Sequence, residues 1–128
     1  MLVRFACALA VMLAVEGAVF AAYNRDLLFL RTPVEELARA PIDTIRAHAV
    51  SALERERVAR RHLDAIAHVA RLRGLDDLEL NALTRLHEAY PQDPEVALLL
   101  ADALRRGGRY EEAETVYQQL LAPSHGGR

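Results

Sequence analysis

The sequence predicts an all-α protein in which one apolar N-terminal helix precedes a short solenoid of antiparallel helix pairs. The first observation is that apolar residues from Ile42 onward recur at the spacing of one helix face. The second is that Gly74 and the pair Gly107-Gly108 fall where turns between helices are needed. The third is that residues 2–23 are the most apolar segment of the chain. At 128 residues with 52% apolar side chains, we expect one modest folded domain with an N-terminal appendage.

Residues 1–31 are expected to form either a membrane anchor or a signal helix. The apolar segment has about the 20 residues that span a bilayer, and it also has the layout of a secretory signal, with Arg4 before an apolar centre. Glu16 weakens both interpretations, because a carboxylate near the bilayer centre costs about 2.5–3.5 kcal/mol. No strong helix breaker precedes Pro33, and the apolar surface continues through residues 27–30, past any cleavage position. We therefore favour a single retained transmembrane helix.

Small residues on this helix would allow close contact with another transmembrane helix. The candidates for such packing are Ala10, Ala14 and Gly17, with Glu16 as a carboxylate that needs a partner in lipid. Arginines flank the segment on both sides, so the positive-inside rule does not fix its orientation. The signal-like layout favours a bacterial inner membrane crossed once, with the helix pairs in the periplasm. If the segment is cleaved instead, the protein would be secreted or periplasmic.

Residues 32–59 are expected to form connecting helices or a degenerate first helix pair. Thr32, Pro33 and Glu35 have the pattern of a helix start, in which the threonine caps the helix and the proline occupies its first turn. This short helix is expected to run to about Arg39, before Pro41 redirects the chain. Whether residues 42–73 form one long helix or two abutting helices stays open.

Residues 94–128 contain the clearest pair of amphipathic helices, joined by the turn Arg106-Gly107-Gly108-Arg109. Ala101 and Ala113 would let the two helix backbones approach closely, while larger residues fill the space beside them. The packing positions are Ala97, Leu100, Ala101 and Leu104 before the turn, and Gly108, Tyr110, Ala113, Tyr117, Leu120 and Leu121 after it. With this pattern the segment resembles a tetratricopeptide repeat, although Ala97 replaces a large aromatic residue.

A weaker copy is found 34 residues upstream, in residues 60–93, and 34 residues is the usual period of that family. Asp76 replaces the aromatic residue after the turn, and Glu79 replaces the small residue of the second helix. We therefore expect less close packing within this pair. The matching positions are Leu63, Ile66, Ala67, Ala70, Gly74, Leu83, Leu86 and Pro91.

The resemblance implies a protein-binding scaffold, since tetratricopeptide repeats hold partner segments on a concave face formed by the first helix of each pair. We therefore expect a membrane-anchored adaptor or assembly factor that binds a peptide segment of a membrane complex or an exported client. The alternative is a structural accessory subunit of a multi-subunit membrane complex. The Lys and Asn residues of the family's carboxylate-clamp subtype are missing. Carried over to this sequence, the concave face has Arg61, Asp64, His68, Arg71, Glu95, Leu98, Asp102, Arg105 and Arg106.

No catalytic, metal or cofactor site is expected. His62 and His68 are six residues apart, which places them roughly 120° apart around a helix, and zinc pairs on one helix need a spacing of three or four. Cys7 is the single cysteine, so no cysteine-based zinc site or intramolecular disulfide can form. The chain contains no glycine-rich phosphate loop. A net charge of −2 gives no reason to expect nucleic acid as a partner.

Overall fold

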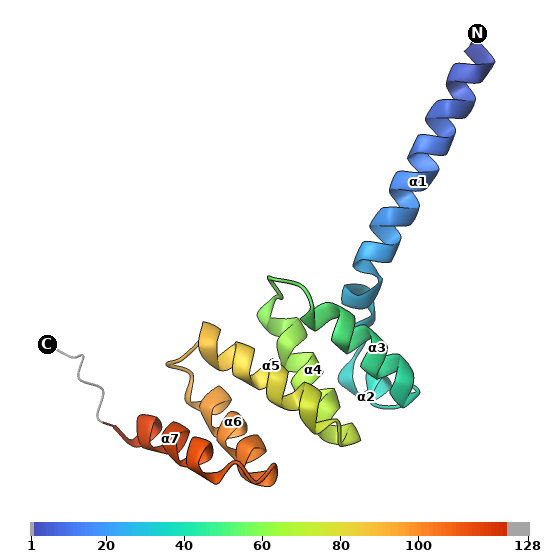
Figure 1. Cartoon of the computed structure of the whole chain (residues 1–128). Coiled ribbons are helices and arrows are strands. Elements are labelled where there is room, and N and C mark those ends of the chain that lie inside the picture. Colours follow the sequence, from blue (N-terminus) through green and yellow to red (C-terminus); the bar gives the residue numbers. More distant parts are fainter. Residues whose placement is uncertain (1, 123–128) are drawn as a thin grey trace, which may run out of the picture.

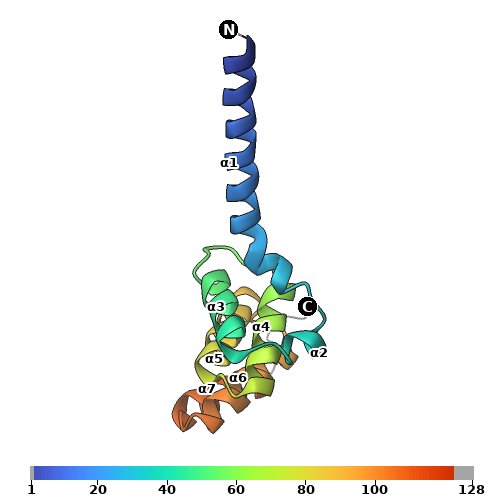
Figure 2. The ribbon, with the colours of Figure 1, turned by 90° about the vertical axis from the view of Figure 1, so that its right-hand side faces the viewer.

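The computed structural model describes the backbone of residues 2–122 and the side chains of residues 2–17 and 29–122. This part of the chain is all-α, as the sequence predicts, and contains seven helices and no strand (Figure 1). The first helix projects from a body formed by the other six (Figures 1 and 2). The helices are α1 (Leu2–Phe29), α2 (Val34–Leu37), α3 (Ile42–Leu53), α4 (Arg60–Arg73), α5 (Asp76–Ala89), α6 (Pro94–Arg106) and α7 (Tyr110–Leu121).

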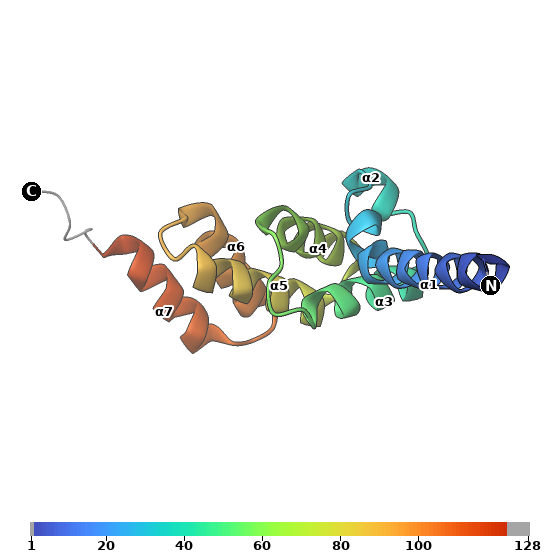
Figure 3. The same ribbon diagram turned by 90° about the horizontal axis from the view of Figure 1, so that it is seen from above.

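The body is a short stack of helix pairs. The pairs α4–α5 and α6–α7 are each closely packed, and α5 packs against α6 to join them. Further along the stack, α2 contacts α4 and α3 contacts α5. Seen from above, α2, α4 and α6 lie along one side of the stack and α3, α5 and α7 along the other (Figure 3). This is the arrangement of a two-layered helical solenoid, in which α2 and α3 occupy the place of an incomplete first pair.

The turns within the two pairs depend on glycine at two positions. Gly74 and Gly108 have φ angles of 69° and 77°, the left-handed region in which a side chain is strained. The helix α6 begins at an Asp93 cap, whose side chain accepts hydrogen bonds from the backbone N–H groups of Glu95 and Val96. Pro94 takes the first helical position, where its missing N–H leaves no donor unsatisfied.

Small residues mark the closest approaches between helices. Ala82 and Ala101 are completely buried, and Ala113 is nearly so, which fits the packing expected around the second turn. The α4–α5 pair is not loosened by Glu79. This side chain is buried, and α4–α5 has the most extensive contact of any two helices in the described part of the chain. The expected weaker packing of that pair was therefore wrong, because Glu79 has a cationic partner on α6 that the pair by itself does not reveal.

One other local expectation is corrected, and one open question is decided. Thr32 does not cap the short helix: α2 has Pro33 at its cap position without a side-chain hydrogen bond, and it ends at Leu37 rather than near Arg39. Residues 42–73 form two helices, separated by residues 54–59. The guanidinium of Arg85 holds this break in place, because it donates hydrogen bonds to the backbone carbonyls of Leu53, Arg55 and Glu56 at the end of α3.

The base of α1 is attached to the body where Phe29 stacks on His48 of α3, with ring centroids 4.2 Å apart. Toward the N-terminus, the described side chains of α1 are exposed on all sides, including Leu2, Val3 and Phe5. Within the part of the chain whose side chains are described, no helix combines the length and apolar character needed to cross a membrane. The predicted transmembrane helix over residues 1–31 extends across Met1 and the side chains of residues 18–28, which lie outside the described part. The anchor therefore stays a prediction.

Candidate functional site

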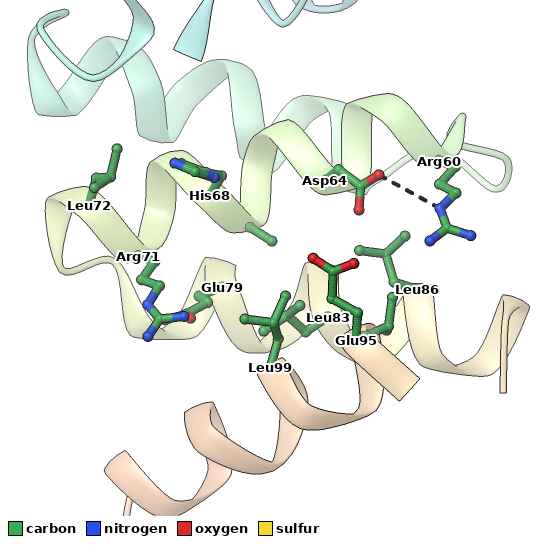
Figure 4. Close-up of a pocket in the computed structure, with 12 residues that line it drawn as sticks. Arg60, Asp64, His68, Arg71, Leu72, Glu79, Leu83, Leu86, Glu95 and Leu99 are labelled. Carbon is green, nitrogen blue, oxygen red and sulfur yellow. Dashed lines mark ion pairs between the residues drawn. The ribbon is translucent and has the colours of Figure 1, made fainter. Parts of the chain in front are cut away.

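A groove of about 530 Å³ lies between α4 and α6, with α5 beneath it (Figure 4). Its floor is apolar and its rim is charged. The floor is formed by Ala67 of α4, Leu83 and Leu86 of α5, and Val96 and Leu99 of α6. The rim and ends are formed by Arg60, Asp64, His68, Arg71, Leu72, Glu79 and Glu95.

The helical repeat explains why these walls face each other. The helices α4 and α6 are the first members of two successive pairs, and each buries the residues that pack against the second helix of its pair. The sides of α4 and α6 that are turned toward each other are therefore left open, and α5 closes the space between them from below. Leu83 and Leu86 sit at a spacing of three on α5, which places both on one side of that helix.

Only some of the residues predicted for the concave face line this groove. Asp64, His68 and Arg71 of α4 and Glu95 of α6 do so. The other predicted residues lie outside the lining; they are Arg61, Leu98, Asp102, Arg105 and Arg106.

The difference is one of helical register. Arg60 and Leu99 line the groove, whereas their neighbours Arg61 and Leu98 do not, because one residue turns a side chain by about 100° around the helix. Leu98 is 52% exposed on the outer side of α6, while Leu99 is half-buried in the floor. Sequence reasoning also missed Glu79. The signal was present, since a carboxylate replaces a small packing residue there.

Three arginines of the predicted face converge on one carboxylate. Asp102 accepts hydrogen bonds from Arg105 and Arg106 at 3.1 Å each, and from Arg71 at 3.5 Å. These contacts lower the pKa of Asp102, with the hydrogen bond from Arg105 as the largest cause. Arg71, Arg105 and Arg106 of the predicted face are therefore already engaged in contacts within the protein.

Arg60 is held at the other end of the groove. Its guanidinium pairs with Asp93, lies 3.7 Å from an Asp64 oxygen and sits 4.5 Å above the centre of the Tyr90 ring. The hydrogen bond with Asp93 raises the pKa of Arg60 and lowers that of Asp93. Arg60 thus ties the start of α4 to the start of α6, and it fixes the width of the groove at this end.

Glu79 lies at the opposite end of the groove and is 1% exposed. One carboxylate oxygen, Oε1, accepts a hydrogen bond from Nη2 of Arg106 at 2.8 Å. This contact is the largest cause of the raised pKa of Arg106. The other oxygen, Oε2, is buried and has no hydrogen-bond partner among the described residues. A buried carboxylate that is only half satisfied is costly, so Glu79 is the most unusual group in the groove.

The structure also shows where the residues predicted for helix packing on α1 and the two histidines lie. On α1, Ala10, Ala14, Glu16 and Gly17 are all exposed, and among the described residues beyond the local helix backbone nothing lies within 4 Å of the place that a Cβ atom at Gly17 would take. His62 is buried and His68 is exposed, so the two histidines do not share a site. Among the described residues, no group of three or more His, Cys, Asp and Glu side chains is arranged to hold a metal ion.

The stack and the groove between first helices are the features by which helical repeat proteins bind other proteins. Residues 80–126 match the family model of the tetratricopeptide repeat. The matched segment covers α6, α7 and most of α5, so it includes two of the three walls of the groove. Tetratricopeptide repeats generally mediate protein–protein interaction, and their fold is not a catalytic one. No curated protein and no solved structure matches the chain.

Proposed function

We propose that the protein binds a peptide segment of a protein partner in the groove between α4 and α6. The observation that carries this proposal is the groove itself, which combines an open apolar floor with a charged rim between the first helices of two successive pairs. Apolar floors supply binding free energy, and a few polar groups at the rim fix the orientation of the ligand. The match of residues 80–126 to tetratricopeptide repeats supports this class of function.

Site-specific photo-crosslinking from neighbouring positions on α6 tests the proposal. A benzophenone amino acid at Leu99 lies in the groove floor, and the same amino acid at Leu98 lies outside it. In cells that make the full chain, we expect a discrete adduct with a protein partner from position 99 and at least roughly tenfold less from position 98. Equal adducts at both positions, or none at position 99, would contradict binding in the groove.

We further propose that α1 anchors the domain in a membrane, with the repeats on the periplasmic side of a bacterial inner membrane. The support is the exposure of apolar side chains on every side of its described part, since a helix that is apolar all round is stable only when lipid or protein surrounds it. Intact-mass measurement should find residues 1–31 retained, and the protein should stay in the membrane pellet after carbonate extraction. A mature N-terminus near residue 22 would contradict the anchor.

An adaptor or assembly factor fits these features if the anchor only holds the repeats at the membrane. A structural accessory subunit is favoured by one observation: Glu16 is exposed and has no partner among the described residues. In lipid such a carboxylate is usually satisfied by a neighbouring helix. Glu16→Leu should then release the protein from a complex of fixed stoichiometry in mild detergent, whereas Val15→Leu should not. An adaptor would be unaffected by either change.

A further inference from the structure

We infer that the groove selects an apolar peptide segment that carries a basic side chain, with the cation held between Asp64 and Glu95. This inference rests on the proposed function of the groove and names the chemistry of the partner. In this inference the carboxylates on the groove walls, and not the arginines, hold the charged group of the partner.

The distribution of charge around the groove is the first support. The charged residues in its lining, together with the residues linked to them through one or two successive ion pairs, comprise six carboxylates and four guanidinium groups. Each guanidinium is already paired with at least one carboxylate. The carboxylates are Asp64, Asp76, Glu79, Asp93, Glu95 and Asp102, and the guanidinium groups belong to Arg60, Arg71, Arg105 and Arg106.

The second support is the position of the two carboxylates in the lining that receive no hydrogen bond from a guanidinium group. Asp64 and Glu95 stand on the opposite walls formed by α4 and α6 (Figure 4). Asp64 has only the 3.7 Å contact with Arg60, which is too long for a hydrogen bond, and the Glu95 carboxylate has no partner among the described residues. Two like charges on facing walls repel each other. A cation between them would replace this repulsion with attraction.

The third support is independent of the rim, because it comes from the buried Glu79. Its Oε2 atom is buried without a hydrogen-bond partner in the described part of the chain, and the residue lines the same groove. A cation in the groove lowers the cost of this half-satisfied carboxylate even without direct contact, since charges interact more strongly near an apolar floor than in water. An acidic ligand would raise that cost.

The apolar floor completes the match to a basic residue. The aliphatic stem of Lys or Arg can lie along Leu83, Leu86 and Leu99 while its charged end reaches the rim. Arg has the better geometry, because its planar guanidinium offers donors in two directions and can serve two carboxylates at once. Apolar residues on either side of the basic one would cover the rest of the floor.

A peptide-display selection on the full chain in detergent micelles tests the inference. We expect enriched peptides to carry Arg or Lys next to apolar residues. A synthetic copy of the best peptide in which Arg is replaced by citrulline, which has nearly the same shape but no charge, should bind at least about tenfold more weakly. The double variant Asp64→Asn, Glu95→Gln should lose affinity for the Arg peptide by a similar factor. The control Glu36→Gln, Glu111→Gln changes two exposed carboxylates outside the groove and should bind normally.

The outcomes separate this inference from the function on which it rests. If selected peptides lose binding to Leu99→Gln but not to Leu98→Gln, yet carry no basic residue, the groove binds peptides and the inference about charge is wrong. If no peptide is enriched, peptide binding itself is contradicted. If the chain dimerises and Asp64→Asn, Glu95→Gln abolishes this, the occupant is a second copy and the peptide inference is overturned. Thermal unfolding of each variant checks that the stack is intact.

Discussion

At the scale of single residues, the ionic contacts of Glu79 and Asp102 decide which groups are available for binding. Glu79 occupies a packing position where the repeat pattern calls for a small side chain, and it is tolerated because Arg106 of the next pair reaches it. The same Arg106 also binds Asp102, which holds Arg105 and, more loosely, Arg71. One buried carboxylate thus organises a network that crosses from one helix pair to the next.

Removing the partner of this buried carboxylate should destabilise the protein. Arg106→Met leaves Glu79 without its hydrogen bond, and we expect a loss of about 1–3 kcal/mol in the free energy of unfolding. The value stays in this range because the Arg106 side chain is 36% exposed, so solvent screens part of the interaction. Urea unfolding measures the change.

The neighbouring Arg105 provides the matched control. It contacts only the exposed side of the network, and Arg105→Met should cost less than about 1 kcal/mol. Adding Glu79→Gln to Arg106→Met should restore part of the stability, because a neutral amide is cheaper to bury than a carboxylate. Equal losses from the two arginine variants would show that Glu79 does not depend on Arg106.

His62 is the second residue with an unusual environment, since it is 4% exposed and neither ring nitrogen has a hydrogen-bond partner within the described part of the chain. Burial lowers the pKa of His62, and the charges of Arg61, Arg31 and Arg55 lower it further. The folded protein therefore binds this proton more weakly than the unfolded chain, whose histidine titrates near about 6.5. The contribution of neutral His62 to the free energy of unfolding is complete above that pH, and it is lost as the pH falls toward the lower pKa of the folded state.

The expected result is a fall in unfolding free energy between pH 7 and 5, at no more than about 1.4 kcal/mol per pH unit from this one group. His62→Leu should flatten this dependence. His68→Leu, at an exposed position, serves as the control and should leave it unchanged. The pKa values of Asp77, Asp93 and Asp102 are lowered, so their contributions are lost only at more acidic pH. An unaltered slope in His62→Leu would contradict the assignment.

At the scale of the helical elements, the turn within each pair requires a left-handed backbone conformation at one glycine only. Gly107 ends α6 with φ −81°, which any residue adopts, whereas Gly108 follows with φ 77°. A side chain at Gly107 would meet the carbonyl oxygens of Ala103 and Leu104 at 3.5 and 3.6 Å, which is ordinary contact.

The two adjacent glycines should therefore respond differently to the same substitution. Gly108→Ala should lower the free energy of unfolding by about 1–2 kcal/mol, because it forces a left-handed conformation on an L-residue. Gly107→Ala should be neutral or stabilise by up to about 1 kcal/mol through reduced freedom of the unfolded chain. Thermal unfolding of the two variants decides the point. The reverse order would mean that the turn has a different geometry.

At the scale of the whole molecule, arginines contact residues that lie about one repeat away along the stack. Arg46 pairs with Asp77 over 31 positions, Arg60 with Asp93 over 33 and Arg71 with Asp102 over 31. Backbone carbonyls are used in the same way. Arg73 of α4 donates to Ala38 and Ala40, and Arg85 of α5 donates to the end of α3. These arginines add polar contacts to the incomplete first pair, whose α2 has only four residues.

Losing both carbonyl-binding arginines should loosen the first pair without unfolding the rest. In Arg73→Met, Arg85→Met, amide hydrogen exchange over residues 34–53 should accelerate by roughly tenfold or more, equivalent to at least about 1.4 kcal/mol of local opening. Exchange in α6 and α7 should stay nearly the same. Arg57→Met, at an exposed position in the same region, is the control. Uniform acceleration along the chain would show that the stack opens as one unit.

The sequence by itself determined the all-α class, the helix pairs and the glycine turns. Apolar spacing and chain reversal are local properties, readable within one or two helices. Of the residues predicted for the concave face, Asp64, His68 and Arg71 of α4 and Glu95 of α6 line the groove between these helices.

Only the tertiary structure decided which charges are free. Asp102 and Glu79 accept hydrogen bonds from Arg71, Arg105 and Arg106, which the sequence predicts for the concave face, and these contacts join residues as far as 31 positions apart. It also decided that Arg60 and Leu99 line the groove in place of Arg61 and Leu98. The break between α3 and α4 likewise depends on Arg85, which lies outside that segment. The lining of the groove and the ion pairs depend on how each helix is rotated about its axis and on which oppositely charged side chains the fold brings together. Neither property can be read from a local sequence pattern.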